Sequence, residues 1–241
     1  MAKAKTFFDV GTYTGNGGLY RVGVPTLRTA YNQQVARSLR FRKSNSAYLS
    51  RTPSGAGNRQ TWTWSGWVKF ASIVSTDYPT LFMGGATQSD TGALRIGIGT
   101  NNLVVQGYNT NFIVSSQVFR DPSAWYHILI AFDTTQATAS NRLKAYVNGT
   151  QITAFGTDNR ASLTQNTNYG INQAALHRIG YESATFGSTY SDFYLGEYYF
   201  IDGQALTPSS FGTTDSVTGA WIPTKYTGTY GTNGFYLPFS D

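Results

Sequence analysis

The stretch Thr61-Trp62-Thr63-Trp64-Ser65-Gly66-Trp67-Val68-Lys69-Phe70 decides the fold. Its apolar residues recur at every second position, so Trp62, Trp64, Val68 and Phe70 share one face of an extended chain. A helix would instead place apolar residues three and four positions apart. The pattern therefore predicts a β-strand with an aromatic face turned toward a core.

The neighbouring stretches repeat this period of two. Residues 38–42, 94–98 and 103–105 alternate apolar with polar or small side chains, which indicates half-buried strands. Residues 125–132 are apolar on both faces, and they predict a central strand that is covered on each side.

Residues 143–153 predict a hairpin with Asn148-Gly149 at its tip. Asn-Gly tolerates the positive φ angles of a type I′ turn, whose twist matches that of the flanking strands. This turn places Val147 opposite Thr150. The residues then expected on the inward face are Leu143, Ala145, Val147 and Ile152.

Composition supports a β-rich globular chain. Hydrophobic residues make up 40% of the 241 residues and charged residues only 12%, so a core can form and helix-supporting runs are absent. The chain has no cysteine, which excludes disulfides, thiolate metal sites and cysteine nucleophiles. We expect no membrane span, because no apolar stretch is long enough, and assembly in a cytoplasm, because residues 1–6 lack a secretory pattern.

Charge is distributed unevenly along the chain. Residues 1–59 carry ten basic side chains and one acid, a net charge of +9, whereas the remainder has a net charge of −3. Residues 1–36 show no strand or helix period, contain a glycine-rich stretch, and yet carry aromatic anchors. We expect an extended N-terminal arm over 1–36 that meets an acidic partner on a neighbouring subunit; packing on its own domain is the alternative.

Six short blocks occur in order along residues 37–241. They are Ser38-Leu39-Arg40-Phe41 with Ala47-Tyr48-Leu49, Thr63-Trp64-Ser65-Gly66-Trp67-Val68-Lys69, Trp125-Tyr126-His127-Ile128 with Phe132-Asp133, Tyr146-Val147-Asn148-Gly149, Arg178-Ile179-Gly180, and Tyr194-Leu195-Gly196-Glu197 with Ala205-Leu206. In these blocks the chain resembles the concanavalin A-like lectin and laminin-G-like domains, in the versions found in tailed-phage structural proteins. The resemblance implies an all-β, two-sheet antiparallel jelly-roll sandwich over 37–241.

The resemblance also implies a role. We expect a non-enzymatic phage virion protein, a capsid decoration or a head or tail fibre subunit, which docks onto other virion proteins as a symmetric oligomer such as a trimer. The basic arm and the first strand would make the contact. The residues predicted to bind the partner are Phe7, Phe8, Tyr13, Tyr20, Arg21, Arg28, Tyr31, Arg40 and Arg42.

The pattern of acids argues against catalysis. Glycosidases on this fold need two carboxyl groups at a fixed separation. The chain has only two glutamates, Glu182 and Glu197, and Asp202 lies five residues after Glu197, on the opposite face of a regular strand. Glu197 is expected to accept structural hydrogen bonds. His127 and His177 have no partner at metal-ligand spacing and are expected to pack.

The sequence also bears on three further ligand classes, namely metals or other cofactors, glycans and nucleic acid. The aspartates are scattered, so neither calcium nor another cofactor is expected. The alternative function is a lectin module for host-surface glycans, because Trp67, Tyr126, Tyr146, Tyr194 and Tyr198 are expected on an outer sheet face, unless loops or the arm cover them. The predicted glycan contacts are Trp67, Tyr108, Asn109 and Tyr146. Nucleic acid is not expected, because the basic stretch holds few arginines.

Overall fold

The structure is a computed structural model that describes residue 35 and residues 37–71, 78–85, 87–183 and 186–239. The described strands are β1 (Leu39–Phe41), β2 (Leu49–Arg51), β3 (Thr61–Phe70), β4 (Thr80–Gly85), β5 (Ala93–Gly99), β6 (Asn102–Gln106), β7 (Asn111–Val118), β8 (Tyr126–Asp133), β9 (Leu143–Val147), β10 (Thr150–Gln151), β11 (Phe155–Asp158), β12 (His177–Ile179), β13 (Phe193–Asp202), β14 (Gly212–Thr214), β15 (Trp221–Pro223) and β16 (Phe235–Leu237). Four short 3-10 turns, η2 (Lys43–Asn45), η3 (Ala139–Asn141), η4 (Arg160–Ser162) and η5 (Pro208–Ser210), complete the described elements. Among these residues no helix has the length and apolarity to cross a membrane.

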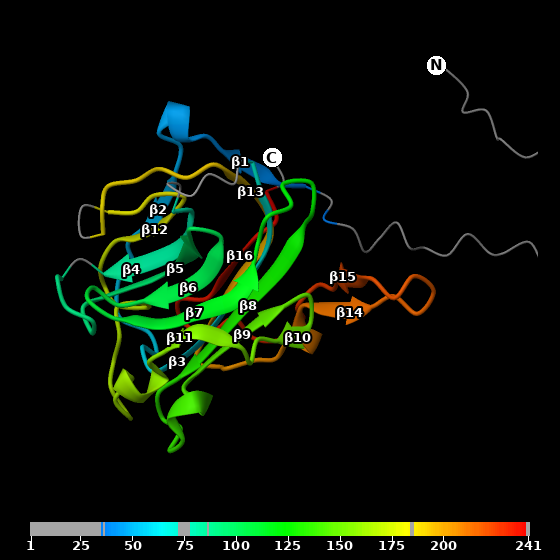
Figure 1. The fold of residues 1–241 in the computed structure, drawn as a ribbon. Coiled ribbons are helices and arrows are strands. Elements are labelled where there is room, and N and C mark those ends of the chain that lie inside the picture. The colour runs from blue at the N-terminus through cyan, green and yellow to red at the C-terminus, as the bar shows by residue number, and fades with distance from the viewer. Residues whose placement is uncertain (1–34, 36, 72–77, 86, 184–185, 240–241) are drawn as a thin grey trace, which may run out of the picture. The chain divides into compact units, whose positions relative to one another are not determined.

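Two antiparallel sheets lie face to face and form a jelly-roll sandwich (Figure 1). The first sheet has the order β1–β13–β3–β8–β9–β10, with β16 paired along the second half of β13. The second sheet has the order β11–β7–β6–β5–β4–β12–β2, and β14 and β15 form a separate two-stranded ribbon. The predicted all-β sandwich is confirmed. The predicted domain boundary at residue 37 stays a prediction, because residues 1–34 and 36 lie outside the described residues.

The inner faces of the two sheets build the main core. On β3, Trp62, Trp64, Val68 and Phe70 are buried in it, as their alternation predicts. The Trp62 ring stacks on Phe132 of β8, with ring centroids 4.8 Å apart. Burying side chains of this size contributes about 2–3 kcal/mol each before the entropy of ordering is subtracted.

The outer face of the first sheet is covered as well. Residues 203–230, which we call the C-terminal wrap, pack Phe211 and Tyr226 against Leu129 and Ala131 of β8. Strand β8 therefore has buried residues on both faces and lies between β3 and β9. The predicted central, doubly covered strand is confirmed.

The β9–β10 hairpin also follows the prediction. Asn148 and Gly149 have φ angles of 47° and 82°, the positive values that a type I′ turn requires. Val147 pairs with Thr150, and the Ile152 amide donates to the Ala145 carbonyl over 2.8 Å. The predicted inward residues belong to the main core.

A β-bulge in β13 overturns one sequence expectation. The register with β3 shifts between Gly196 and Tyr199, and Glu197 adopts a φ of 46°. The extra residue reverses the alternation that follows, so Tyr198 points into the main core instead of outward. Tyr126 was also expected outside, but it lies on the inner side of β8, where its ring meets Phe119 at 5.1 Å.

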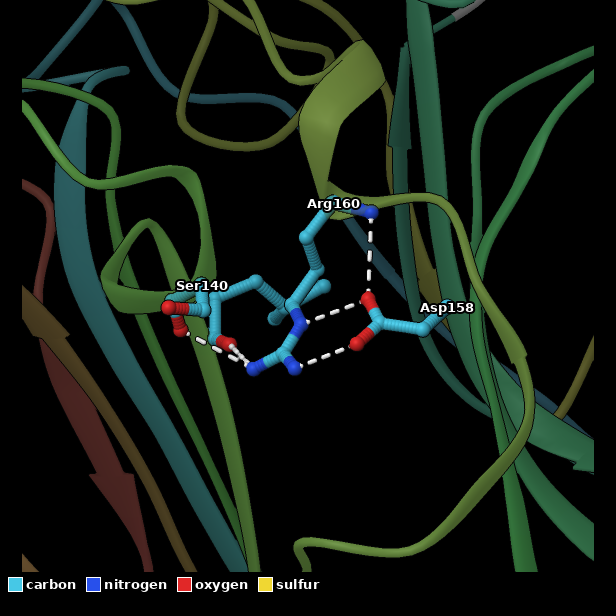
Figure 2. Close-up of polar contacts among 4 residues, drawn as sticks. Ser140, Asp158 and Arg160 are labelled. Carbon is cyan, nitrogen blue, oxygen red and sulfur yellow. Dashed lines mark hydrogen bonds and ion pairs between the residues drawn. The ribbon is translucent and has the colours of Figure 1, made fainter.

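Arg160 links the two sheets at one end of the sandwich (Figure 2). Its Nε and Nη2 donate to the two carboxylate oxygens of Asp158 over 2.8 and 2.5 Å, and its Nη1 donates to the Ser140 carbonyl over 2.9 Å. Asp158 ends β11 of the second sheet, whereas Ser140 lies in the turn between β8 and β9 of the first. The side-chain hydrogen bond from Arg160 lowers the pKa of Asp158.

Asp202, at the end of β13, is a buried hub for three loops. Its Oδ1 accepts from the Asn58 amide and from Asn172 Nδ2 over 2.8 and 2.6 Å. Its Oδ2 accepts from the Asn233 amide over 3.0 Å. A Cβ on Gly57 would collide with Asp202 and Asn172, so the close approach of this loop requires glycine. The hub joins segments that are far apart in sequence, which periodicity does not reveal.

The two histidines are buried packing residues in this structure. His127 Nδ1 accepts from the Trp221 indole N–H over 2.9 Å, and His177 Nε2 accepts from the Asn172 amide over 2.9 Å. Each ring thus uses one nitrogen as an acceptor, which a proton on that nitrogen would prevent. Burial lowers the pKa of His127 to about 3 and that of His177 to about 4.

These histidines predict a loss of stability in mild acid. The unfolded chain binds protons near pH 6.5, whereas the folded chain keeps both rings neutral, so their contribution is complete above pH 6.5 and declines as the pH falls toward 4. By pH 5 we expect each histidine to cost about 2 kcal/mol of unfolding free energy. Urea unfolding at pH 7 and pH 5 measures this, and His177→Gln should remove about half of the difference. Equal free energies at the two pH values would contradict the prediction.

Candidate functional site

The predicted partner contacts divide into two groups. Phe7, Phe8, Tyr13, Tyr20, Arg21, Arg28 and Tyr31 lie outside the described residues. Arg40 and Arg42 are described, and both are exposed at β1. The side chain of Arg40 is held within the domain: its Nη1 donates to the Tyr194 hydroxyl over 2.6 Å, and its Nη2 lies 3.5 Å from Asp192.

Val35 shows where the N-terminal segment joins the domain. Its side chain fills the space that a Cβ on Gly196 would occupy. Gly196 pairs with Trp67 of β3 and lies two positions along β13 from Tyr194, which pairs with Arg40 of β1. Because Trp67 and Tyr194 alternate with core residues, Val35 lies on the outer face of the first sheet.

The predicted glycan contacts do not form one open surface. Trp67 is 6% exposed and Tyr146 is 9% exposed. Trp67 packs beside His127 at 5.3 Å between ring centroids, and Tyr146 packs in the cluster under the C-terminal wrap. A sugar ring needs an exposed aromatic face, which these two side chains lack while the wrap is in place. Tyr146 is thus covered by the C-terminal wrap, and Trp67 is buried beside His127.

Tyr108 and Asn109 lie on a separate loop that Asp90 organises. Asp90 Oδ1 accepts from the amides of Asn109 and Thr110 over 2.6 and 3.1 Å, and its Oδ2 accepts from the Thr110 hydroxyl over 2.6 Å. The Asn109 side chain is exposed, and Tyr108 is half-buried with its ring 6.5 Å from that of Phe186. Through these hydrogen bonds, Asp90 stabilises the conformation of the loop that carries Tyr108 and Asn109.

Ser65 and His127 form a buried pair that resembles a catalytic dyad in distance only. Ser65 Oγ lies 2.8 Å from His127 Nε2. The Trp221 indole N–H can only donate, so His127 Nδ1 is the acceptor and the ring proton resides on Nε2. A general base needs that nitrogen free to take the serine proton. In this arrangement His127 donates to Ser65, and Trp67 and Trp221 flank the ring.

Both glutamates interact with other side chains of the domain. Glu197 Oε2 accepts from the hydroxyls of Tyr199 and Tyr236 over 3.1 and 2.7 Å, which confirms the predicted structural hydrogen bonds. Burial, with the nearby Glu197 charge, raises the pKa of both tyrosines. Burial also raises the pKa of Glu182, which the charge of Arg95 opposes. Within the described residues, no three His, Cys, Asp or Glu side chains gather as a metal site would require.

An aromatic surface that the sequence analysis missed lies beside β2 and β12. The rings of Tyr181 and Tyr190 are 4.5 Å apart, and Tyr48 lies 5.4 Å from Tyr181. The guanidinium of Arg178 lies 5.7 Å from the Tyr181 ring, and Tyr48 is 46% exposed. We call these four residues the tyrosine surface. Tyr48 comes from a segment far from the other three in sequence, so only the tertiary fold brings the four residues together.

Comparison with solved structures gives distant similarities of architecture. Domains LG4-5 of the mouse laminin alpha1 chain share 10% identity with this chain, at a TM-score of 0.49, over 84% of this chain and 47% of the laminin chain. A heptameric SAP-like pentraxin from Limulus polyphemus shares 16% identity at a TM-score of 0.45, over 66% and 71% of the two chains. A Trypanosoma rangeli sialidase shares 14% identity at a TM-score of 0.44, over 63% of this chain and 22% of its own.

No curated protein matches the chain. A family model does match it, that of Laminin_G_3, described as the concanavalin A-like lectin/glucanases superfamily, and it aligns with residues 43–210. This range covers well over half of the sequence and includes strands from both sheets, from β2 to β13. The sandwich topology and the sequence match agree, and the chain belongs to the concanavalin A-like lectin/glucanases superfamily.

Proposed function

We propose that this chain is a non-enzymatic structural protein of a tailed-phage virion, a capsid decoration or fibre subunit that docks through its basic N-terminal segment. The observation that carries the proposal is the charge asymmetry, with +9 in residues 1–59 and −3 in the remainder. Such a segment is attracted to an acidic protein lattice, and its aromatic side chains supply anchors for a packed contact. Assembly takes place in the host cytoplasm, and the subunit forms a symmetric oligomer.

The polar groups of the described domain support a non-catalytic role. The Ser65–His127 pair is held in the wrong tautomer for nucleophile activation. Glu197 accepts from two tyrosines, and Asp202 is enclosed by amide donors. A hydrolase on this fold needs one carboxyl as acid and a second as nucleophile or base, and these groups serve the fold instead.

Deleting residues 1–36 tests the docking proposal. We expect the truncated chain to keep the β-rich circular dichroism spectrum of the full chain but to be absent from purified particles, because its attachment segment is gone. The matched control is the full chain with Lys225→Gln, which removes one charge from the C-terminal wrap. Incorporation of the truncated chain at the level of the full chain would exclude the proposal.

A second test addresses catalysis. We expect the full chain to release no reducing ends from a panel of bacterial capsular and cell-wall polysaccharides over a day. Activity that Glu197→Gln abolishes and Glu182→Gln preserves would overturn the non-enzymatic assignment, because it would identify a working carboxyl group.

Glycan binding is the second candidate, and the tyrosine surface favours it. Exposed aromatic rings stack on the apolar faces of sugars, and Arg178 adds a hydrogen-bond donor beside them. Tyr48 is exposed enough that its removal changes few core contacts.

A glycan array distinguishes the two possible sugar surfaces. If the chain binds glycans here, Tyr48→Ala and Tyr190→Ala should each weaken the strongest signal at least tenfold, because each removes a stacking ring. Tyr108→Ala, on the loop that Asp90 organises, should leave the signal unchanged. Loss of binding in Tyr108→Ala alone would move the site to that loop, and no signal at all would remove this candidate.

A further inference from the structure

An open cavity of about 410 Å³ lies at one edge of the sandwich, between the two sheets. Strands β2, β4 and β12 of the second sheet form one side, and β13 and β16 of the first sheet form the other. Its apolar walls include Leu49, Phe82, Ile179, Phe200, Phe235 and Leu237. Phe82, Ile179 and Phe200 also belong to the main core, so the cavity is a continuation of the core that remains open. Its size lies in the range of small-molecule sites.

The polar side chains on the cavity floor are already satisfied inside the protein. His177 accepts from the Asn172 amide and donates through Nδ1 to the Ala175 carbonyl over 2.8 Å. Asn172 Nδ2 donates to Asp202, and Asn172 Oδ1 accepts from Asn233 Nδ2 over 3.0 Å. A ligand rich in hydroxyl groups would therefore bury polar atoms without partners, which is costly. The floor favours an apolar ligand body.

Arg51 and Arg178 are the charged residues among the described residues that line this cavity, and Arg51 is the one on its inner side. Arg51 pairs with His177 across β2 and β12, so its side chain lies on the inner face. Its Nη1 donates to the Asn233 carbonyl over 2.8 Å, and its guanidinium lies 5.0 Å from the Phe235 ring. No described residue accepts from its Nε or Nη2, and the lining contains no Asp or Glu. These two donors are positioned for a carboxylate.

Arg178 provides a close contrast. It also borders the cavity, but it pairs with Ser50, the residue that precedes Arg51 on β2. Its side chain therefore points to the other face of the second sheet, where its guanidinium meets the Tyr181 ring. Arg51 and Arg178 lie on adjacent strands, but they place their positive charges on opposite faces of the second sheet.

We propose that this cavity binds a small monocarboxylate with an aliphatic or aromatic body. The body lies against Phe82, Phe200 and Phe235, and the carboxylate accepts from Nε and Nη2 of Arg51. The apolar area removed from water supplies the attraction, and the charge-assisted hydrogen bonds select an acid over a neutral molecule of the same shape. The inference rests on the described domain alone and is independent of the proposed virion role.

Octanoate and 1-octanol are the matched probes for this site. Titrated into the full chain by calorimetry, octanoate should bind saturably and at least tenfold more tightly than octanol, because octanol lacks the charge. The methyl NMR signals of Ile179 should shift with octanoate, while those of Ile222 in the β14–β15 ribbon should not. Arg51→Gln should remove the preference for the acid, and Arg178→Gln should preserve it.

A second variant tests the cavity itself. Leu49 is 36% exposed at the rim, so Leu49→Trp narrows the cavity with little change to the core and should weaken both probes at least tenfold. Circular dichroism melting confirms that each variant is folded. Three outcomes would each overturn the proposal: equal affinity for octanoate and octanol, an equal loss in Arg51→Gln and Arg178→Gln, or no saturable binding at concentrations up to about 5 mM.

Discussion

The rest of the structure depends on the burial of the first sheet on both faces. Strands β3, β8 and β13 present large aromatic side chains inward to the second sheet, and β8, β9 and β13 present further aromatic and aliphatic side chains outward to the C-terminal wrap. Removing both faces from water stabilises the sheet far more than one face would, because the hydrophobic contribution grows with the apolar area buried. It also means that this sheet has little aromatic surface left for a ligand.

This constraint determines where recognition can take place. In an open jelly roll, the outer aromatics of a curved sheet would be natural contacts for a sugar, but Trp67 is buried beside His127 and Tyr146 is packed under the wrap. The wrap also brings Trp221 onto His127, and the indole hydrogen bond sets the tautomer in which His127 donates to Ser65. Exposed aromatic and cationic side chains gather at the sandwich edge around β2 and β12, where one face carries the tyrosine surface and the other opens into the cavity.

How far the sequence predicts such a structure depends on the range of the interaction. Alternation is a local property, so the inward faces of β3 and β9 and the Asn148-Gly149 turn were predicted correctly. Tyr198 was assigned to the wrong face because a single bulged residue, Glu197, reverses the alternation after it. The Asp202 hub and the tyrosine surface were not predicted at all, since each joins segments separated by a hundred residues or more.

The sequence by itself determined the class of fold, the inner faces of the main strands, the hairpin and the uneven distribution of charge, because period, turn chemistry and charge are all properties of neighbouring residues. The tertiary structure alone decided which aromatics are covered, which nitrogen of His127 carries the proton, and which of two adjacent arginines faces the cavity. These outcomes depend on contacts between distant segments, and such contacts exist only once the two sheets and the wrap have packed together.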